Sequence, residues 1–458
     1  MFKKHAVNMT EGSIVKNLLL FALPVMLSGI LQLLYNAADV VVVGRFAGHT
    51  SLAAVGSTSS LVTLITNLAI GLSVGVNILV ARHIGARDSH RANRALHTAI
   101  TVALVSGILT SLVGFFISRQ ALIWMDSPAD VIDKSTLYLK IYFLGAPASV
   151  MYNFGSAALR SAGDTTRPLY FLTASGIVNV VLNLVFVIVF HMDVAGVALA
   201  TITSQYLSAT LVLIALKKGQ GCLFFRISEI CFDKREFSEI VRLGIPAAIQ
   251  GATFSISNVI LQSGVNSFDD SLIVAGNAAA GNIEGFVYTV MNAFYHATMT
   301  FTSQNIGARQ PERIPKIITR ACMLSFISWA VVASIVFIFP EQLVSLYTDE
   351  PEAIAIAIER FHLVNLTYFL CGIMEISTGV LRGSGYSIVS MIISIVGVCG
   401  IRIVWVFTVF QKIHEFKILY MCYPISWIPV IIANFVMFAI IYKKKLKKNS
   451  KLYDVKMQ

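Results

Sequence analysis

Charged residues are scarce in this sequence. Only 13% of its 458 residues are Asp, Glu, Lys or Arg, whereas 56% are hydrophobic and the mean hydropathy is +0.75. A soluble protein carries roughly 25% charged residues, so this chain has too little polar surface to stay in water. Its apolar runs reach about the 20 residues that cross a bilayer. The sequence therefore excludes a soluble protein and predicts an integral membrane protein.

Cysteine is also sparse, and its spacing indicates neither disulfides nor a metal site. We therefore expect buried or loop thiols and no cofactor. The six positions are Cys222, Cys231, Cys322, Cys371, Cys399 and Cys422. A cleavable signal is not visible either, because the first apolar run is too long for an h-region and lacks a small-residue cleavage site. We expect this run to remain as a helix.

Basic residues are in excess, with a net charge of +11. They lie in alternate loops and in a tail that follows the last apolar run, and such clusters mark the cytoplasmic face of a membrane and its anionic lipids. We therefore expect membrane lipids, and no nucleic acid, as partners.

Three short motifs occur twice, which predicts a tandem duplication. Each motif of the second half lies 222 residues after its counterpart in the first half. The pairs are Ala22-Leu23-Pro24 with Gly244-Ile245-Pro246, His83-Ile84-Gly85-Ala86-Arg87 with Asn305-Ile306-Gly307-Ala308-Arg309, and Leu159-Arg160-Ser161-Ala162-Gly163 with Leu381-Arg382-Gly383-Ser384-Gly385. An internal repeat in a hydrophobic chain is typical of a transporter whose substrate site lies between two halves.

The apolar runs predict an all-α protein with twelve transmembrane helices. The spans are 14–43, 52–82, 94–118, 132–159, 168–191, 194–217, 238–263, 272–304, 316–340, 353–381, 386–410 and 416–442. The expected organisation is a cytoplasmic lead (1–13), an N-lobe (14–217), a cytoplasmic connector (218–236), a C-lobe (237–442) and a basic cytoplasmic tail (443–458).

The orientation follows from the positive charges. When loops are assigned alternately, one set holds 27 Lys and Arg residues and the other set holds seven. This bias places both termini in the cytoplasm of a multi-pass protein of the cell membrane. An even number of spans in each half makes the two lobes parallel, pseudo-symmetric copies.

Four charged residues lie well inside the predicted spans: Asp39, Glu284, Glu375 and Arg402. A charge near the bilayer centre costs at least about 2.5–3.5 kcal/mol, so each needs a partner, water or neutralisation. None of the four is repeated 222 residues away. The shared scaffold therefore does not require them, which indicates a function specific to each half.

Polar residues accompany these charges at helical spacing. The sets are Gln32, Tyr35, Asn36 and Asp39 on the first span, Asn179 and Asn183 on the fifth, and Glu284, Tyr288, Asn292 and His296 on the eighth. Residues three or four apart share one side of a helix. Such a stripe faces either a water-filled cavity or a neighbouring helix to which its amides bind.

The depths of two acidic residues nearly coincide. At about 1.5 Å per residue, Glu284 lies roughly 21 Å from the outer end of its span and Glu375 about 10 Å from the inner end of its own. They could form a carboxylate pair that carries a proton or holds a sodium ion. Arg402 reaches the same layer and could instead be a permanent salt-bridge partner of either one. These alternatives stay open from the sequence.

Proline occurs at equivalent points of the first and seventh spans, as Pro24 and Pro246. Proline removes a backbone hydrogen bond and kinks a helix, so we expect hinges there. An acyltransferase-like H-x4-D spacing at His83 and Asp88 is not repeated in the second half. We attribute it to the duplicated Ile-Gly-Ala-Arg turn and expect no enzyme.

Several of these motifs resemble multidrug and toxic compound extrusion (MATE) transporters. They are Pro24, the pattern Tyr35-Asn36-Ala37-Ala38-Asp39 running to Val43-Gly44-Arg45, the Ile-Gly-Ala-Arg turns, Leu159-Arg160-Ser161-Ala162-Gly163-Asp164-Thr165, and Asn179. The resemblance covers nearly the whole chain. It implies twelve helices in two six-helix lobes around a central cavity, and export of cationic, amphipathic compounds in exchange for protons or sodium ions.

The resemblance also implies roles for single residues. Asp39 and Asn179 match the carboxylate and the asparagine of the family's N-lobe cation site, where a sodium ion could bind. Members of the family often have an aspartate where Asn183 stands, so Asp39 is the main titrating group. Glu375 corresponds to an acidic residue that some members carry on the tenth helix.

These inferences predict a secondary multidrug exporter that works by alternating access, as a monomer. Tyr35 and Asn183 join Asp39 in the N-lobe coupling site. Glu284, Glu375, Arg402, Tyr288 and His296 form the C-lobe site, and Gln32, Asn36, Gln250 and Asn292 line the substrate cavity. The alternative is a flippase or exporter of a lipid-linked or other polar metabolite. A flippase of that kind would need a larger and more basic cavity to bind pyrophosphate.

Overall fold

The computed structural model describes residues 6–125, 127–219 and 223–446, which are helical apart from turns and loops. Residues 1–5 of the expected lead and 447–458 of the expected tail lie outside the described residues. The first half contains α1 (Ile14–Val42), α2 (His49–Gly85), α3 (Ser89–Trp124), α4 (Ile132–Leu144), α5 (Ala146–Ser161), α6 (Thr166–Leu184) and α7 (Asp193–Lys217).

The second half contains α8 (Lys234–Asn266), α9 (Ser271–Gly307), α10 (Arg313–Ile338), α11 (Pro340–Val344), α12 (Pro351–Leu363), α13 (Tyr368–Gly383), α14 (Ser387–Ser394), α15 (Ile401–Trp405) and α16 (Phe416–Ile441). Short 3-10 or π-helical turns lie at Val43–Ala47, Val185–Val189, Ile227–Glu229, Asn365–Thr367, Ile395–Gly400, Val406–Phe410 and Tyr442–Leu446.

The all-α membrane fold predicted from composition is confirmed. Ten helical stretches among the described residues are long and apolar enough to cross a membrane. The predicted spans 132–159 and 272–304 are helical but are not among the ten. Both carry polar or charged side chains along their length, including Lys134 and Lys140 in the first and Glu284 in the second.

Two predicted continuous spans are interrupted at equivalent points of the repeat. The fourth breaks at Gly145, between α4 and α5, and Pro147 follows in the first turn of α5. The tenth breaks at the 3-10 turn Asn365–Thr367, between α12 and α13. Glycine and proline favour a break because glycine lowers helix stability and proline lacks the backbone donor that a continuing helix needs.

Two of the three duplicated motifs are helix C-terminal caps. At the end of α2, Asp88 N bonds His83 O at 3.0 Å and Arg87 N bonds Ile84 O at 2.9 Å. This is the pattern of a Schellman cap, in which the residue after the helix adopts a left-handed conformation. Arg87 has φ 57° and its repeat equivalent Arg309 has φ 59°. Gly163 and Gly385, at the other repeated motif, have φ 86° and 91°. The repeat therefore preserves the turns.

The chain packs into two compact units that differ from its linear halves. Of the described residues, unit 1 comprises 6–7 and Leu27–Ala248, and unit 2 comprises Asn8–Met26 and those from Ile249 onward. The first part of α1 therefore belongs to unit 2, which the second half of the chain mainly forms. The first part of α8 belongs to unit 1, which the first half mainly forms. The expected lobes, 14–217 and 237–442, differ from the packing units by these two exchanged segments.

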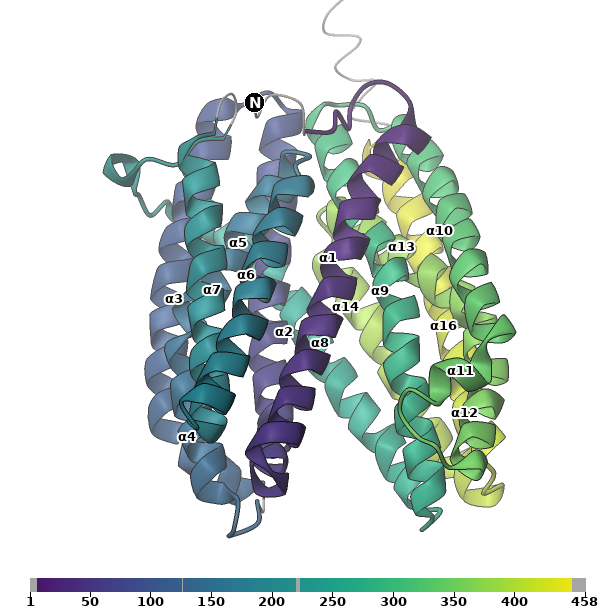
Figure 1. The fold of residues 1–458 in the computed structure, drawn as a ribbon. Coiled ribbons are helices and arrows are strands. Elements are labelled where there is room, and N and C mark those ends of the chain that lie inside the picture. The colour runs from purple at the N-terminus through teal and green to yellow at the C-terminus, as the bar shows by residue number, and fades with distance from the viewer. Residues whose placement is uncertain (1–5, 126, 220–222, 447–458) are drawn as a thin grey trace, which may run out of the picture. The chain divides into compact units, whose positions relative to one another are not determined.

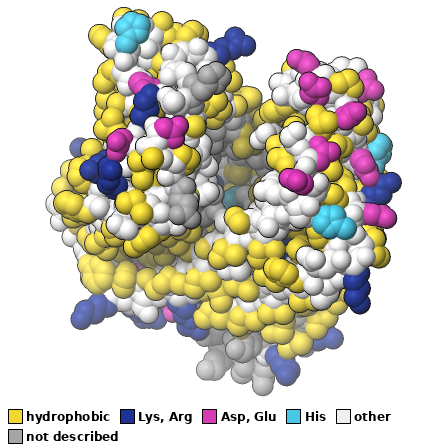
Figure 2. All heavy atoms as spheres, turned by 90° about the horizontal axis from the view of Figure 1, so that it is seen from below, with side chains coloured by type: hydrophobic (Ala, Val, Ile, Leu, Met, Phe, Trp, Pro, Cys, Tyr) yellow, Lys and Arg dark blue, Asp and Glu magenta, His cyan; other side chains and the backbone are white. Residues whose placement is uncertain are grey.

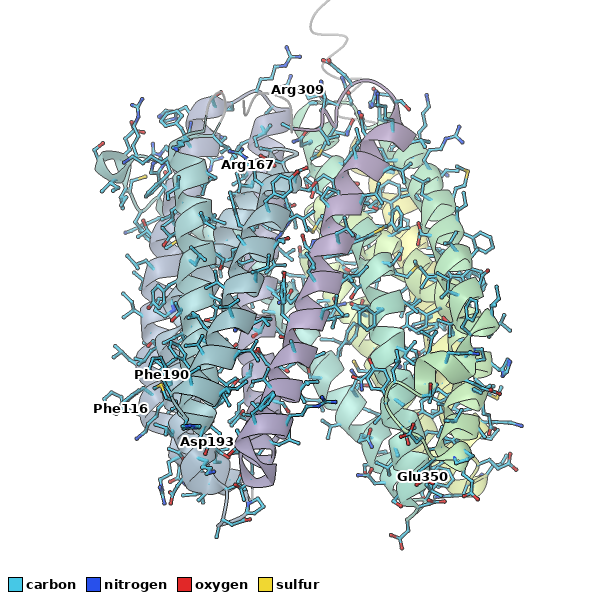
Figure 3. All side chains as sticks on the ribbon, in the orientation of Figure 1. Phe116, Arg167, Phe190, Asp193, Arg309 and Glu350 are labelled. Carbon is cyan, nitrogen blue, oxygen red and sulfur yellow. The ribbon has the colours of Figure 1, made fainter. Side chains whose placement is uncertain are left out.

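Within unit 1, α5 is a central helix that packs against α2, α3 and α7 (Figure 1). Within unit 2, α9 packs against α10, α12 and α13, and α13 also packs against α16. Many large side chains that point away from unit 1 are apolar. Phe116 is 77% exposed and Phe190 61% exposed (Figure 3), as expected of surfaces that face lipid.

Acidic residues gather at one end of unit 2, around Glu350 (Figures 2 and 3). They come from the loops before α9, α12 and α16 and from α11 and α12. The exposed members are Asp269, Asp270, Glu341, Asp349, Glu350, Glu352 and Glu415. This end of the unit therefore carries negative charge, while Arg309 lies at the opposite end (Figure 3).

Candidate functional site

A polar chamber of about 330 Å³ lies inside unit 1. Its wall is built by α1, α2, α4, α5, α6 and α7, and Asp39 is the only charged side chain among the lining residues. The lining residues are Gln32, Tyr35, Asn36, Asp39, Val62, Thr63, Thr66, Asn67, Tyr138, Tyr142, Ser149, Tyr152, Asn153, Leu172, Ser175, Gly176, Asn179, Thr201, Ser204, Gln205 and Ser208.

The four polar residues of the first span all lie in this wall. Gln32, Tyr35, Asn36 and Asp39 lie on one side of α1, and that side faces the chamber rather than lipid. The Tyr35 hydroxyl donates to Thr173 O at 3.3 Å and its ring lies against Gly176. The absence of a side chain at Gly176 is what makes room for the ring, because a Cβ there would lie 2.0 Å from it.

Asp39 meets the two asparagines of α6. Asn183 Nδ2 donates to Asp39 Oδ1 and also lies 3.4 Å from Asn179 Oδ1. Asn183 is fully buried and its own Oδ1 has no hydrogen-bond partner. The local arrangement thus offers carboxylate and amide oxygens side by side, which is the ligand chemistry that hard cations prefer.

Sequence reasoning missed the walls that α4, α5 and α7 provide. Tyr138 and Tyr142 come from α4, and Thr201, Gln205 and Ser208 from α7. The α7 residues recur at intervals of three or four, the same signal that identified the face of α1. Hydroxyl groups are less conspicuous than charges in an apolar run, which is why this set was overlooked.

In unit 2, Glu284 is held in a buried salt bridge with Arg360. Arg360 Nη2 lies 2.5 Å from Glu284 Oε2 and Nε lies 3.0 Å from Oε1. Arg360 also donates to Asn277 O and to the Tyr420 hydroxyl, both at 3.2 Å. The side chains of Glu284 and Arg360 are only 5% and 9% exposed. Both carboxylate oxygens of Glu284 are therefore occupied by a permanent cation.

This arrangement favours neither of the two alternatives that the sequence left open for Glu284, and it adds buried arginines that sequence analysis did not name as buried. Arg402 is not the partner of Glu284, because Arg360 occupies that place. Arg402 is not the only buried arginine, because Arg360 and Arg382 are also buried. Glu284 and Glu375 do not form a carboxylate pair, since Glu284 is bound to Arg360. Sequence analysis did not place Arg360 among the charges well inside a span, although it lies within the tenth predicted span, 353–381.

Glu375 is buried on α13, and the hydrogen bond to its carboxylate comes from a neutral group. The Tyr288 hydroxyl donates to Glu375 Oε1 at 3.4 Å, and Asn292 Nδ2 donates to that hydroxyl at 3.3 Å. The predicted stripe on α9 thus leads to Glu375 through Tyr288 and Asn292. His296 follows one turn later, with its ring 5.0 Å from that of Tyr295.

The remaining predicted residues of unit 2 lie elsewhere. Gln250 is buried, and its Oε1 accepts a hydrogen bond of 2.6 Å from Arg382. It is thus committed to that arginine rather than presented to a substrate. Arg402 lies with its guanidinium 4.1 Å from the Tyr423 ring centroid, and its Nε donates to Ser426 at 3.3 Å. Among the described residues Arg402 makes no ion pair.

The structure also shows where the two prolines and the enzyme-like His83 and Asp88 lie. Pro24 and Pro246 lie inside the continuous helices α1 and α8. His83 Nε2 lies 3.0 Å from Glu236 Oε2, and Asp88 accepts from Arg91 N as the N-cap of α3. His83 and Asp88 thus serve local structure. Among the described residues no His, Cys, Asp and Glu cluster could hold a metal ion.

Relatives of known sequence share most of this chain's length. It is 26% identical over 445 residues to the probable multidrug resistance protein YoeA of Bacillus subtilis, covering 95% of this chain and 96% of that protein. It is 24% identical over 416 residues to the probable multidrug resistance protein NorM of Thermotoga maritima, with coverage of 88% and 87%. It is also 25% identical over 344 residues to an FAD transporter of Shewanella oneidensis, with coverage of 72% and 73%.

Solved structures share the fold. The crystal structure of MATE in complex with MaL6 matches with a TM-score of 0.90 at 22% identity, covering 97% of this chain and 99% of that chain. MATE in the bent conformation matches with a TM-score of 0.87 at 22% identity and the same coverage.

The sequence profile of the MatE family matches this chain twice. It covers residues 24–185 and again residues 246–408, so the two matches begin at Pro24 and Pro246, 222 residues apart. The duplication read from three short motifs is therefore the duplication of this family's unit. Because the two matches together cover well over half of its length, the chain belongs to the MATE family of membrane transporters and not to a family of enzymes.

Proposed function

We propose that this chain is a secondary active exporter that exchanges a proton or a sodium ion for cationic, amphipathic compounds. The observation that carries the proposal is the chamber of unit 1, in which Asp39 is the only charge among neutral hydroxyl and amide groups. A single carboxylate in such a wall can serve either a small cation or an organic cation. Competition between the two for one carboxylate couples their movements.

The electrostatics favour this competition. At about 4 Å and an effective dielectric constant of 20, two unit charges interact with about 4 kcal/mol. Protonation of Asp39 removes most of that attraction. A sodium ion bound to the Asp39 carboxylate has the same effect, with the unpartnered Oδ1 of Asn183 beside it and Asn179 nearby. The organic cation is then released, and departure of the small cation restores the negative chamber.

The hinge proposal rests on the position of Pro24. It lies inside α1, and the boundary between the packing units falls two residues later, between Met26 and Leu27. The same relation holds for Pro246 in α8. Proline weakens a helix locally, so α1 can bend there and move Asp39 relative to its first part. A related MATE has been solved in a bent conformation, which supports such a hinge.

In unit 2 we propose Glu375, and not Glu284, as the second coupling group. Glu284 is neutralised by Arg360, whereas Glu375 accepts a hydrogen bond from the Tyr288 hydroxyl at 3.4 Å and makes no salt bridge within the described residues. The stripe of Tyr288, Asn292 and His296 offers hydrogen-bonding groups along which a proton or small ion reaches Glu375.

We further propose that both termini and the connector face the cytoplasm of a bacterial cell, and that the protein acts as a monomer with two lobes. The bias of basic residues to one set of loops supports this orientation. The acidic end of unit 2 would then face outward, where it attracts cations.

The experiment is uptake of a fluorescent organic cation into vesicles that contain the purified protein. A proton gradient and a sodium gradient are imposed separately. Asp39→Asn should abolish gradient-driven uptake while the protein remains in the membrane. The matched control is Asp133→Asn, whose carboxylate is 79% exposed and lies outside the chamber; it should transport normally. Full transport by Asp39→Asn would remove Asp39 from the mechanism.

One observation favours a second candidate, export of an anionic metabolite. Arg402 is buried and makes no ion pair within the described parts of the chain, so a substrate phosphate could be its partner. The FAD transporter of Shewanella oneidensis is a relative with such a substrate. This alternative would be supported if the vesicles take up FAD and Arg402→Gln abolishes that uptake. Uptake of the organic cation but not of FAD would exclude it.

A further inference from the structure

The described part of the connector between α7 and α8, residues 223–233, is hydrogen-bonded to the side of α3. Its backbone makes four hydrogen bonds to α3 side chains, between 2.9 and 3.3 Å long: Phe224 N to Asn93, Arg226 N to His97, Cys231 O to Thr101 and Asp233 N to Thr98. Arg94 adds a salt bridge of 2.7 Å to Asp233. These residues are thus held against α3 as an ordered part of unit 1.

His97 is the central fastening. Its Nδ1 lies 2.8 Å from Asn93 O and its Nε2 lies 3.1 Å from Arg226 N. A carbonyl can only accept and a backbone N–H can only donate, so the imidazole is neutral with its proton on Nδ1. The Phe225 ring stacks on it with centroids 5.4 Å apart. His97 is 2% exposed and serves to hold the connector.

The connector covers α3 just above the surface that faces lipid. Residues 95–100 of α3 are all buried, whereas Leu104 and Val105 are 48% and 61% exposed. Thr101, which binds the connector, lies three residues before Leu104, a rise of about 4.5 Å. The connector therefore lies at the edge of the apolar surface, and interfacial segments bury their apolar face about 5–10 Å into the headgroup boundary at such an edge.

The free face of the connector is apolar. Ile227 is 70% exposed and Ile230 48% exposed, and they bracket the 3-10 turn Ile227–Glu229. Residues i and i+3 of a 3-10 helix eclipse each other, so the two isoleucines point the same way. Phe232 is 52% exposed beside them. In Figure 1 this turn projects sideways from α3 and α7.

Basic residues flank this apolar face. Lys217, Lys218, Lys234 and Arg235 are exposed, and none of them has an ion-pair partner within the described residues. Apolar side chains between unpaired basic ones are the composition of segments that lie in the interface of an anionic membrane. A second copy of the chain would need acidic groups opposite these four, whereas lipid phosphates supply them.

We propose that the connector is an interfacial membrane anchor, with Ile227 and Ile230 inserted into the lipid at the boundary of headgroups and acyl chains. Its partner is the surface of an anionic phospholipid bilayer, bound by the two isoleucines and by the flanking lysines and arginine. The anchor acts independently of which compound is transported, so its test does not require transport.

The test is photo-crosslinking at single positions of the full chain. Benzoylphenylalanine replaces Ile227, Ile230 or Glu229, and each protein is reconstituted in vesicles of phosphatidylcholine and phosphatidylglycerol and irradiated. Glu229 is the matched control, because it lies in the same turn but carries a charge and pairs with Arg226. Mass spectrometry of the connector peptide should show the addition of one phospholipid at positions 227 and 230 and none at 229.

Two results would overturn the proposal. Adducts that join two protein chains through position 227 would show that a second copy covers this face. Irradiation without any adduct at 227 and 230, in protein that is correctly inserted, would show that the turn stands in water. All three replaced side chains are exposed, so the variants should fold, and monodisperse elution after purification checks this.

Discussion

The buried pair of Glu284 and Arg360 allows a sharp prediction. We expect Arg360→Gln to destabilise the protein strongly, because it leaves the Glu284 carboxylate in an apolar bundle with 5% of its side chain exposed. We expect Glu284→Gln combined with Arg360→Gln to be more stable than Arg360→Gln alone, because no uncompensated charge then remains.

The magnitude follows from the geometry. Two charge-assisted contacts of 2.5 and 3.0 Å join the pair, and removal of one partner of a buried pair costs about 3–5 kcal/mol. That is roughly a third of the stability of an ordinary domain. The double variant should recover about 2–3 kcal/mol as the interaction energy of the cycle.

The assay is reversible unfolding in mixed micelles with increasing sodium dodecyl sulfate, followed by circular dichroism. Arg119→Gln is the control, because Arg119 pairs with Asp133 on the surface, where both side chains are more than half exposed. Such pairs contribute about 0–1 kcal/mol. An effect of Arg360→Gln no larger than that of Arg119→Gln would refute the reasoning.

Transport by the double variant tests whether Glu284 takes part in ion coupling. If the salt bridge permanently neutralises Glu284, the folded double variant should still exchange the organic cation for the coupling ion. Glu375→Gln, measured beside it, should impair exchange. A stable double variant that has lost ion dependence would show that Glu284 itself carries the coupling ion.

Three further predictions concern unit 1. Asn183→Asp should strengthen sodium binding on the order of tenfold, because a second carboxylate then faces the cation. The measurement is the sodium concentration that gives half-maximal uptake. Gly176→Ala should cost about 1–3 kcal/mol and impair uptake, because its methyl group would lie 2.0 Å from the Tyr35 ring; adding Tyr35→Leu should restore folding. The backbone N–H of Glu236 holds the pKa of Asp233 below its usual value. A lowered carboxyl pKa means that its stabilisation is present at neutral pH and is lost as pH falls through the folded pKa. Hydrogen-exchange protection of residues 223–236 should therefore fall in acid, and in Asp233→Asn it should lose this dependence.

Local patterns were sufficient where a structure depends on neighbours in the chain. The spacing of Gln32, Tyr35 and Asp39 already places them on one side of a helix, because a helix repeats every 3.6 residues. The repeated Ile-Gly-Ala-Arg motif is a C-terminal cap, whose hydrogen bonds span five residues or fewer. The shortage of charge alone determined the membrane class.

Contacts between distant residues were beyond those patterns. Arg360 lies 76 residues from Glu284, and only the packing of α12 against α9 brings its guanidinium to the carboxylate. In the same way, the connector reaches α3 through hydrogen bonds across about 130 residues.

The sequence by itself determined the membrane class, the duplication and the polar side of α1, because hydropathy and helical periodicity are properties of neighbouring residues. Only the tertiary structure decided which charges remain available. The availability of a buried charge depends on which distant side chain shares its surroundings, and helix packing sets this. Asp39 therefore meets amides, whereas Glu284 meets a guanidinium.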